Sequence, residues 1–254
     1  WIDFTTDIND ILFTIIDRKR KFPATMLLRS LGFSSDEDIY NAFDLILDLE
    51  PSKIDLEALS HYVVIEDIID HETGELFVES GKELNESIIQ TLKKNKTKTI
   101  KVVDVRNNID SMMLHNTIQK DPTKSTEEAL MKVYLLLRGS EAPSPESAEK
   151  FINRMFFFPK KYDLGQVGRY RLDKQFNLDN SGNDSVLTHD DFLITLKFLI
   201  QMRKGLRAPD DIDHLGNRRV RTVGEQLKVQ FNSALARMVR TVYERMNLRE
   251  SETI

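Results

Sequence analysis

The chain has 254 residues, of which 40% are hydrophobic and 30% charged, a composition typical of a globular protein with enough apolar material for one large domain or two modest ones. Its formal net charge of −5 argues against a dedicated DNA-binding domain, which is usually basic. Cysteine is absent, which excludes disulfides and thiolate metal sites, and no apolar run approaches the roughly 20 residues of a membrane span.

The first part of the chain predicts a β-hairpin followed by two short helices. Residues 2–16 hold two runs of β-branched and aromatic residues around a polar centre, which favours two strands joined by a turn. Pro23 opens and Gly32 closes a short apolar stretch, the usual asymmetry of helix ends. A second helix is expected after residues 34–35, because acidic residues follow and suit the helix dipole. Residues 46–60 are poorly patterned.

Residues 61–105 change to a strand pattern and predict a small inserted α/β module with its own minor core. The expected elements are strands at 62–65, 76–78 and 99–105, a turn at 71–74 and a helix over about 86–92. Residues 106–124 are expected to lead out of this module.

The remainder of the chain is expected to be mainly helical. Helix starts are predicted at Ser125, Ser144 and Thr188, because each is a good N-cap residue that precedes a helical pattern. A capping box over 222–225 predicts the start of a long last helix. The apolar stripe of that helix, at steps of three and four, consists of Val223, Leu227, Phe231, Leu235, Met238, Val242 and Met246.

The sequence contains no motif for catalysis or metal binding. Its five histidines share no spacing for joint metal ligation on a helix, and there is no nucleotide-binding glycine loop or nucleophile elbow. Residues 179–184 faintly resemble a calcium loop, but Asp184 and Asp190 stand where an EF-hand needs glycine and glutamate. A polar loop before a capped helix is the favoured interpretation, and an independent hydrolase or metal enzyme has no support.

Residues 210–221 form a polar segment directly before the last helix, with three aspartates, three arginines and a glycine turn. Three interpretations are open. In the first, the aspartates pair with the arginines in an ordinary inter-helix loop. In the second, the aspartates hold a metal ion, although nearby arginines are electrostatically unfavourable for one. In the third, the segment contacts a polynucleotide. Guanidinium groups neutralise phosphates and recognise guanine edges, and a carboxylate accepts hydrogen bonds from an unpaired guanine.

Basic residues cluster at 18–21 and again at 218–221. A run of charges is most often a solvated face, but two clusters far apart in sequence can also join one surface.

The string from Asp211 to Arg221, followed by Val223-Gly224-Glu225, resembles a signature of bacterial RNA polymerase β subunits. The flanks agree in order over nearly the whole chain and are weakest across about 45–69. Segments that resemble the family's lobe are 1–4, 16–21, 23–25, 134–138, 149–157, 162–164 and 167–169. The chain departs from the family pattern over Arg138-Gly-Ser-Glu-Ala-Pro143, where arginine, proline, glycine, glutamate and two prolines are expected, and at Lys161, where an arginine is common.

The resemblance implies that the chain is an internal fragment of β, with an α+β fold. A mainly helical lobe with an N-terminal β-hairpin and a small inserted α/β module would end in a long amphipathic helix. The lobe would comprise residues 1–60 and 106–215, and the module residues 61–105. Residues 216–254 would be a return segment and long helix toward the protrusion domain.

The resemblance also implies a role in lining the downstream DNA cleft and contacting the non-template strand near the transcription start. Asp213 would accept hydrogen bonds from an unstacked guanine, in a pocket lined by Ile212 and Arg218. Trp1 would stack on a neighbouring base, the alternative for this residue being a core anchor. The residues near the strand's backbone would be Asp17, Arg18, Arg138 and Lys161.

The partners implied are the non-template strand and downstream duplex, the rest of β, the β′, α and ω subunits, sigma factor and transcription factors, in the cytoplasm and without a membrane. No catalytic residue, metal or cofactor is expected in this fragment, because the magnesium-binding aspartates of the parent nucleotidyltransferase lie in another subunit. The alternative function is an isolated lobe that acts as a protein-interaction module for a transcription factor or phage protein.

Overall fold

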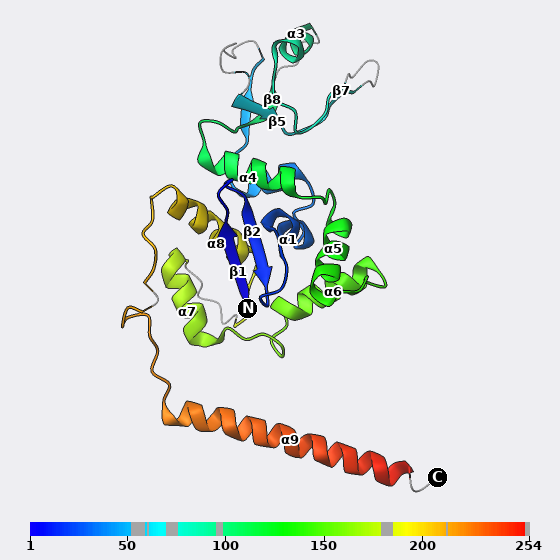
Figure 1. The fold of residues 1–254 in the computed structure, drawn as a ribbon, viewed down its shortest axis with the longest axis vertical. Coiled ribbons are helices and arrows are strands. Elements are labelled where there is room, and N and C mark those ends of the chain that lie inside the picture. Colours follow the sequence, from blue (N-terminus) through cyan, green and yellow to red (C-terminus); the bar gives the residue numbers. More distant parts are fainter. Residues whose placement is uncertain are drawn as a thin grey trace. The chain divides into compact units, whose positions relative to one another are not determined.

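The computed structural model describes residues 1–51, 59, 61–69, 76–94, 99–178, 185–211 and 213–251 and has the α+β fold expected from the sequence (Figure 1). Two compact units, 1–207 and 208–254, divide the chain. The strands in the described residues are β1 (Ile2–Thr6), β2 (Leu12–Ile16), β3 (Lys21–Pro23), β4 (Leu47–Leu49), β5 (Tyr62–Val64), β6 (Ile68–Ile69), β7 (Leu76–Val78) and β8 (Ile100–Asp104). The helices are α1 (Ala24–Ser30), α2 (Asp36–Ala42), α3 (Glu86–Lys94), α4 (Ile109–Lys120), α5 (Thr126–Arg138), α6 (Pro145–Phe156), α7 (Gly165–Phe176), α8 (His189–Arg203) and α9 (Val223–Ser251).

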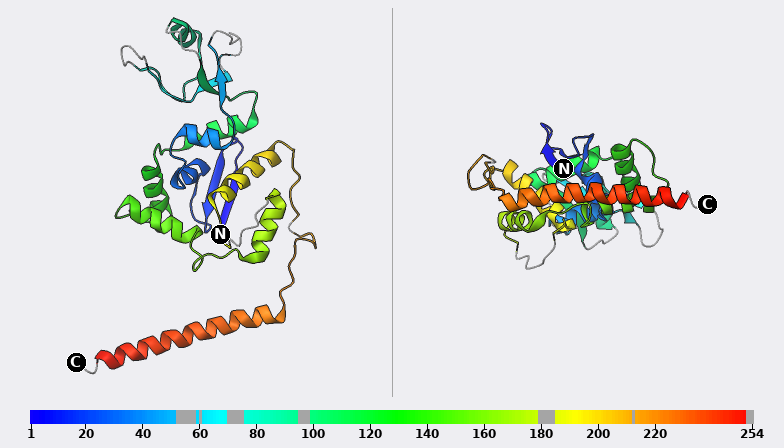
Figure 2. Two further views of the ribbon diagram at one scale, coloured as in Figure 1. Left: turned by 180° about the vertical axis from the view of Figure 1, so that it is seen from behind. Right: turned by 90° about the horizontal axis from the view of Figure 1, so that it is seen from below.

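The predicted N-terminal hairpin is confirmed as β1 and β2, which pair antiparallel from Ile2 opposite Ile16 to Thr6 opposite Leu12. A third strand, β3, pairs with the other edge of β2. The sequence did not predict β3, because it has three residues and ends in proline, which cannot donate to a strand ladder. Helices α1 and α4 contact β2, and α8 contacts β1, so this sheet lies among the helices of the first unit (Figures 1 and 2).

The predicted N-caps are confirmed. The hydroxyl oxygens of Ser125, Ser144 and Thr188 each accept a hydrogen bond from the backbone N–H three residues later. Thr222 does the same for Glu225 at 3.3 Å, but the Glu225 carboxylate accepts from Arg219 instead of from the cap backbone. Only one of the two hydrogen bonds of the predicted capping box is therefore formed, the one accepted by the Thr222 hydroxyl.

Two helices were missed in the sequence. Residues 106–124 contain α4, which packs against β2 on one side and β8 on another, so its buried positions do not form a single stripe. Helix α7 begins at a glycine, lacks acidic residues in its first turn and has no side-chain cap, so the usual start signals are missing. No helix in the described residues is long and apolar enough to cross a membrane.

The inserted module has a core of its own but shares its sheet with the rest of the first unit. The sheet has the order β4-β8-β5, and β4 comes from the poorly patterned segment before residue 61. Val63 and Val103 face the same core as Leu12, whereas Val64 and Val102 face the module's core. Alternate residues of β5 and β8 therefore belong to two different cores. The turn expected at 71–74 lies outside the described residues.

This shared sheet predicts which part of the insertion is separable. Replacing residues 67–99 by Asn-Gly, so that Glu66 and Ile100 flank a two-residue turn, keeps Val63 and Val103 in the main core. Excising all of 61–105 removes both. We expect the first variant to unfold cooperatively at a lowered temperature and the second to lose its folded state, as followed by circular dichroism. Equal stability of the two variants would contradict the division into two cores.

Buried His115 on α4 predicts a pH dependence of stability. Its Nδ1 lies 3.2 Å from the hydroxyl oxygen of Tyr40, and its Nε2 lies 2.8 Å from the amide nitrogen of Gln119. Burial lowers the pKa of His115 below its ordinary value of 6.5, and Glu83 and Asp36 oppose this shift. As the pH falls through 6.5, the unfolded chain binds a proton that the folded chain does not, so stability is lost.

The free energy of unfolding should therefore fall between about pH 7 and about pH 5. His115→Gln should reduce that slope by up to roughly 1.4 kcal/mol per pH unit. Urea unfolding curves across this range measure it, and equal slopes for the variant and the parent chain would count against the buried neutral imidazole.

Candidate nucleic-acid interface

The turn between β2 and β3 places Asp17 and Arg18 at the end of the first sheet. Both residues have positive φ, 50° and 55°, and the N–H of Lys19 donates to the carbonyl oxygen of Ile16 at 3.0 Å. Two consecutive positive φ values are typical of the tight type I′ hairpin turn. Arginine adopts this region at a cost of roughly 1–2 kcal/mol, so the surrounding contacts must hold it there.

Trp1 lies beside this turn. The Asp17 N–H donates to the Trp1 carbonyl oxygen at 2.8 Å, and the Arg18 guanidinium carbon lies 5.4 Å from the centre of the Trp1 ring. The indole N–H donates to the Asp3 carboxylate at 3.0 Å, and the residue is 72% exposed. Trp1 is thus not a core anchor of this unit. It is an exposed ring with a cation over it, which is suited to stacking on a base.

The same turn is fastened to the C-terminal end of α5. The Lys19 ammonium donates to the carbonyl oxygen of Leu137 at 2.5 Å. The next residue is Arg138, and Gly139 then ends the helix in the left-handed conformation with φ of 78°. Gly139 stands where the family resemblance leads one to expect proline, and its backbone freedom directs the chain toward α6.

Arg138 and Lys161 line one hollow of about 700 Å³ between α5 and α6. The guanidinium carbon of Arg138 lies 4.8 Å from the ring centre of Phe151, and Phe151 contacts Tyr134 edge to face at 5.1 Å. The full lining is Tyr134, Arg138, Ser147, Lys150, Phe151, Arg154, Met155 and Lys161. We refer to these residues as the basic hollow.

The basic hollow contains four exposed cations that have no acidic partner among the described residues. Within the part of the chain that the structure describes, neither Arg138 nor Lys161 forms an ion pair, and the same holds for Lys150 and Arg154. Exposed cations beside aromatic rings are the combination that binds single-stranded nucleic acid, through phosphates and stacked bases. This local charge is hidden in the net charge of the whole chain.

Lys150 and Arg154 were not recognised in the sequence. They stand four residues apart on α6 and therefore share a face of that helix with Phe151 between them. This spacing, after the confirmed start at Pro145, was the signal available. The spacing alone does not indicate a binding surface. The packing of α5 against α6 does so, because it brings Arg138 to the same hollow as Lys150 and Arg154.

In the second unit, the polar segment before α9 is held by its own hydrogen bonds. The Asn217 amide donates to Asp210 Oδ1 and to the carbonyl oxygen of Asp211, each at 2.7 Å. The Asp213 N–H donates to Asp211 Oδ1 at 2.9 Å. These bonds fix a compact loop that presents Asp213 to solvent.

The arginines of this loop do not pair with its aspartates in the described residues. Arg219 instead donates twice to Glu225, at 2.7 and 2.5 Å, which lowers the pKa of Glu225 and raises the pKa of Arg219. The side chains of Asp213 and Arg218 are exposed and have no partner among the residues that the structure describes. Ile212 lies outside the described residues. No group of three or more potential ligands that could hold a metal ion occurs among the described residues.

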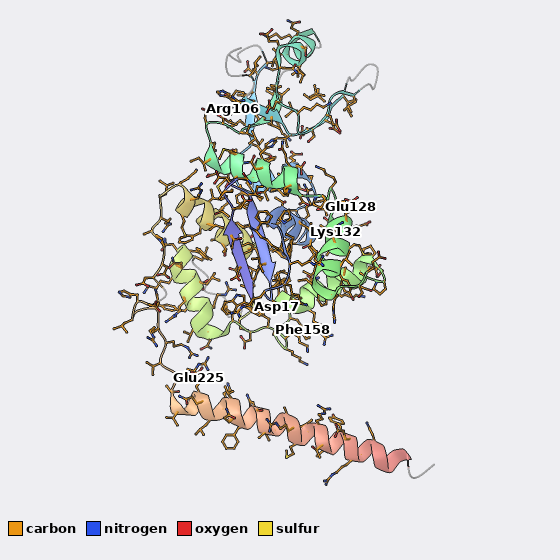
Figure 3. All side chains as sticks on the ribbon, in the orientation of Figure 1. Asp17, Arg106, Glu128, Lys132, Phe158 and Glu225 are labelled. Atoms are coloured by element: carbon orange, nitrogen blue, oxygen red, sulfur yellow. The ribbon has the colours of Figure 1, made fainter. Side chains whose placement is uncertain are left out.

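The predicted site residues thus fall into two sets, each described in its own unit. Trp1, Asp17 and Arg18 meet at the β2–β3 turn, with Arg138 and Lys161 in the basic hollow beyond Lys19. Figure 3 shows Asp17 at the end of the first sheet. Asp213 and Arg218 belong to the second unit.

A family model described as RNA polymerase Rpb2, domain 2, matches residues 1–221. The chain belongs to this family. It is 42% identical over 269 aligned residues to the DNA-directed RNA polymerase subunit beta of Flavobacterium psychrophilum, and 43% identical to that of Porphyromonas gingivalis strain ATCC 33277. Each comparison covers 99% of this chain and 21% of the relative, so the chain spans about a fifth of these relatives' length.

Membership of the Rpb2 domain 2 family confirms the resemblance seen in the string from Asp211 to Arg221 and in its flanks. The matched range includes both the β2–β3 turn and the basic hollow and ends at the last residue of that string.

Proposed function

We propose that the chain is the lobe of a DNA-directed RNA polymerase β subunit and contacts the non-template strand along the downstream DNA cleft. The basic hollow supports this proposal most directly, because it is lined by four cations that have no acidic partner among the described residues, and one of them, Arg138, lies over the Phe151 ring. Phosphates of an unpaired strand are the anions that such a surface suits. The other polymerase subunits and sigma factor are the partners of this proposal, and the cytoplasm is its location.

The proposed contacts are of two kinds, to phosphates and to bases. Arg18, Arg138 and Lys161 supply charge to phosphates, which gives affinity independent of sequence. The contacts to bases would come from Asp213, whose carboxylate has no partner among the described residues, and from Trp1, whose ring is exposed. The sequence preference of the lobe would therefore come from the second group.

Helix α9 supports the proposal that residues 216–254 return toward another part of β. Its apolar stripe is largely exposed in this chain, with Phe231 64% and Leu235 50% accessible. A stripe of this length needs a packing partner. We propose that the partner is the protrusion domain of the same β chain, since the relatives extend far beyond the aligned region.

The alternative, a protein-interaction module for a transcription factor or phage protein, has one supporting observation. A groove of about 450 Å³ runs beside α5, with Met131 and Leu135 exposing apolar surface between Glu127 and Glu141. An apolar floor with an acidic rim suits a basic amphipathic segment. Loss of such a partner on Leu135→Glu, with promoter binding intact, would favour this role.

Arg18→Ala tests the charge contacts. In a polymerase assembled with the complete β chain, the variant should shorten the lifetime of the open promoter complex on every promoter alike. The slope of the logarithm of stability against the logarithm of salt concentration should fall by about 0.7–0.9, the value for one phosphate contact. Arg106→Ala is the matched control, because this exposed arginine lies just after β8 and lines neither the basic hollow nor the β2–β3 turn (Figure 3). A loss confined to some promoter sequences, with an unchanged salt slope, would contradict the phosphate role.

A further inference from the structure

A second hollow, of about 730 Å³, lies at the C-terminal end of α6 and is not used by any contact proposed above. It is lined by Lys150, Asn153, Arg154, Phe157, Phe158 and His189. Phe158 is 45% exposed, a high value for a phenylalanine, and Figure 3 places it at the same end of the first unit as Asp17. We refer to these residues as the aromatic hollow.

Phe157 lines the aromatic hollow and is held in place by aromatic neighbours. The Phe157 ring lies edge to face with His189, with centroids 4.6 Å apart, and with Phe192 at 6.1 Å. Phe192 is buried in the core cluster that also contains Ile16. Phe157 is thus anchored, whereas Phe158 and His189 remain exposed above it. A preorganised aromatic platform that is open to solvent is suited to stacking a flat ring.

The two hollows share their cations. Lys150 and Arg154 line both, and they stand one helical turn apart on α6, so they form a basic ridge with aromatic rings on either side. On one side lie Tyr134 and Phe151, and on the other Phe157 and Phe158. Two stacking surfaces joined by a basic ridge match an unpaired polynucleotide, in which successive bases alternate with phosphates.

We propose that the aromatic hollow binds a second unpaired base of a single-stranded polynucleotide, stacked on Phe158, while Lys150 and Arg154 neutralise the phosphates between this base and the basic hollow. The identity of the strand as the non-template strand rests on the proposed function. The existence of the second base site rests on the aromatic hollow itself. The continuity of the two surfaces through shared cations favours nucleic acid over a protein occupant.

The first test replaces Phe158 in the complete β chain of an assembled polymerase. Phe158→Ala should accelerate dissociation of the open complex by roughly fivefold or more, the loss expected for one stacked base, whereas Phe158→Tyr should keep the parent rate because the ring remains. Tyr170→Ala is the matched control, since Tyr170 is 64% exposed on α7 and lines neither hollow. A parent-like rate for Phe158→Ala, or failure of Phe158→Tyr to preserve it, would overturn the proposal.

The second test concerns the ridge. Lys150→Ala combined with Arg154→Ala should lower the salt slope of open-complex stability by about 1.4, because single strands contribute about 0.7 per phosphate. Arg106→Ala should leave the slope unchanged. An unchanged slope in the double variant would overturn the shared-cation arrangement.

A photoreactive phenylalanine analogue at position 158 identifies the occupant. Cross-links to single-stranded non-template nucleotides are expected. Cross-links to a protein subunit would overturn the proposal in favour of a protein occupant. If Phe158→Ala leaves the dissociation rate of the open complex unchanged while Arg138→Ala increases it, the second base site is refuted and the proposed function is retained. If Arg138→Ala and Lys161→Ala also leave that rate unchanged, the proposed function itself fails.

Discussion

Replacing Asp191 with alanine is expected to destabilise the first unit by about 3–5 kcal/mol, because the buried Arg169 guanidinium then loses the Asp191 carboxylate and keeps the longer ion pair to Asp173, at 3.7 Å. Two guanidinium nitrogens of Arg169 each donate to Asp191 at 2.9 Å, and the two residues are 5% and 2% exposed. Asp191 also accepts the Thr188 N–H at 2.7 Å, so it joins the start of α8 to α7. Its loss removes the ion pair and part of the helix cap together.

Arg169 cannot escape this penalty by losing its proton. In the unaltered chain, hydrogen bonding by Asp191 raises the pKa of Arg169. Without Asp191 the guanidinium still keeps its charge, because arginine is not deprotonated in proteins. In the resemblance to the polymerase lobe, Arg169 is part of the string at 167–169, and the structure gives this arginine a structural contact between α7 and α8.

Chemical denaturation of Asp191→Ala, Arg169→Leu and the double variant measures the effect, and the double variant should cost less than the sum of the single ones. The matched control is Arg240→Ala on α9. Its pair with Glu244 is also 2.9 Å long but is exposed, and such pairs contribute less than about 1 kcal/mol. A cost for Asp191→Ala as small as that of the control would refute the buried pair.

Much of the fold follows from local signals. The serines and threonines at 125, 144 and 188 predict helix starts because a hydroxyl needs only its own next turn to act as a cap. Strands β3 and β4 were missed because their sequences, Lys-Phe-Pro and Leu-Asp-Leu, lack the β-branched residues present in the equally short β5 and β7. β4 is a strand only because β8 pairs with it from about fifty residues later in the sequence. Buried Arg169 was missed for the same reason, since burial depends on α8.

The candidate site was predictable in part. The family resemblance alone singled out Trp1 and Arg138. Arg18 also stands in the basic cluster at 18–21, but the cluster by itself gives no reason to choose Arg18 over its neighbours. The contact of Arg18 with the Trp1 ring depends on two positive φ values that no residue type in the turn demands. The basic ridge of Lys150 and Arg154 was visible as a spacing, but its uncompensated charge is a property of the packed surface.

Asp213→Ala should reduce the preference for guanine at one non-template position, with little change in the salt slope. Guanine presents two donors on its Watson–Crick edge, and a carboxylate accepts both, whereas adenine cannot supply the same pattern. The Asp213 carboxylate has no partner in the described residues, and the loop bonds to Asp211 and Asn217 hold its backbone. In the proposed base pocket, loss of this carboxylate leaves the two guanine donors unpaired, at a cost of about 1–3 kcal/mol.

Asp211→Ala serves as the comparison for loop structure, because Asp211 bonds the loop backbone. If Asp211→Ala lowers stability on all promoters without changing the guanine preference, the effect of Asp213→Ala can be assigned to its own carboxylate.

We propose that this chain contacts and reads the non-template strand. The test is the lifetime of the open complex on two promoters that differ only in guanine or adenine at the matching non-template base. The polymerase with the unaltered β chain should hold the guanine promoter roughly 5- to 150-fold longer, and Asp213→Ala should bring the two lifetimes together. Full retention of the guanine preference by Asp213→Ala would contradict the claim.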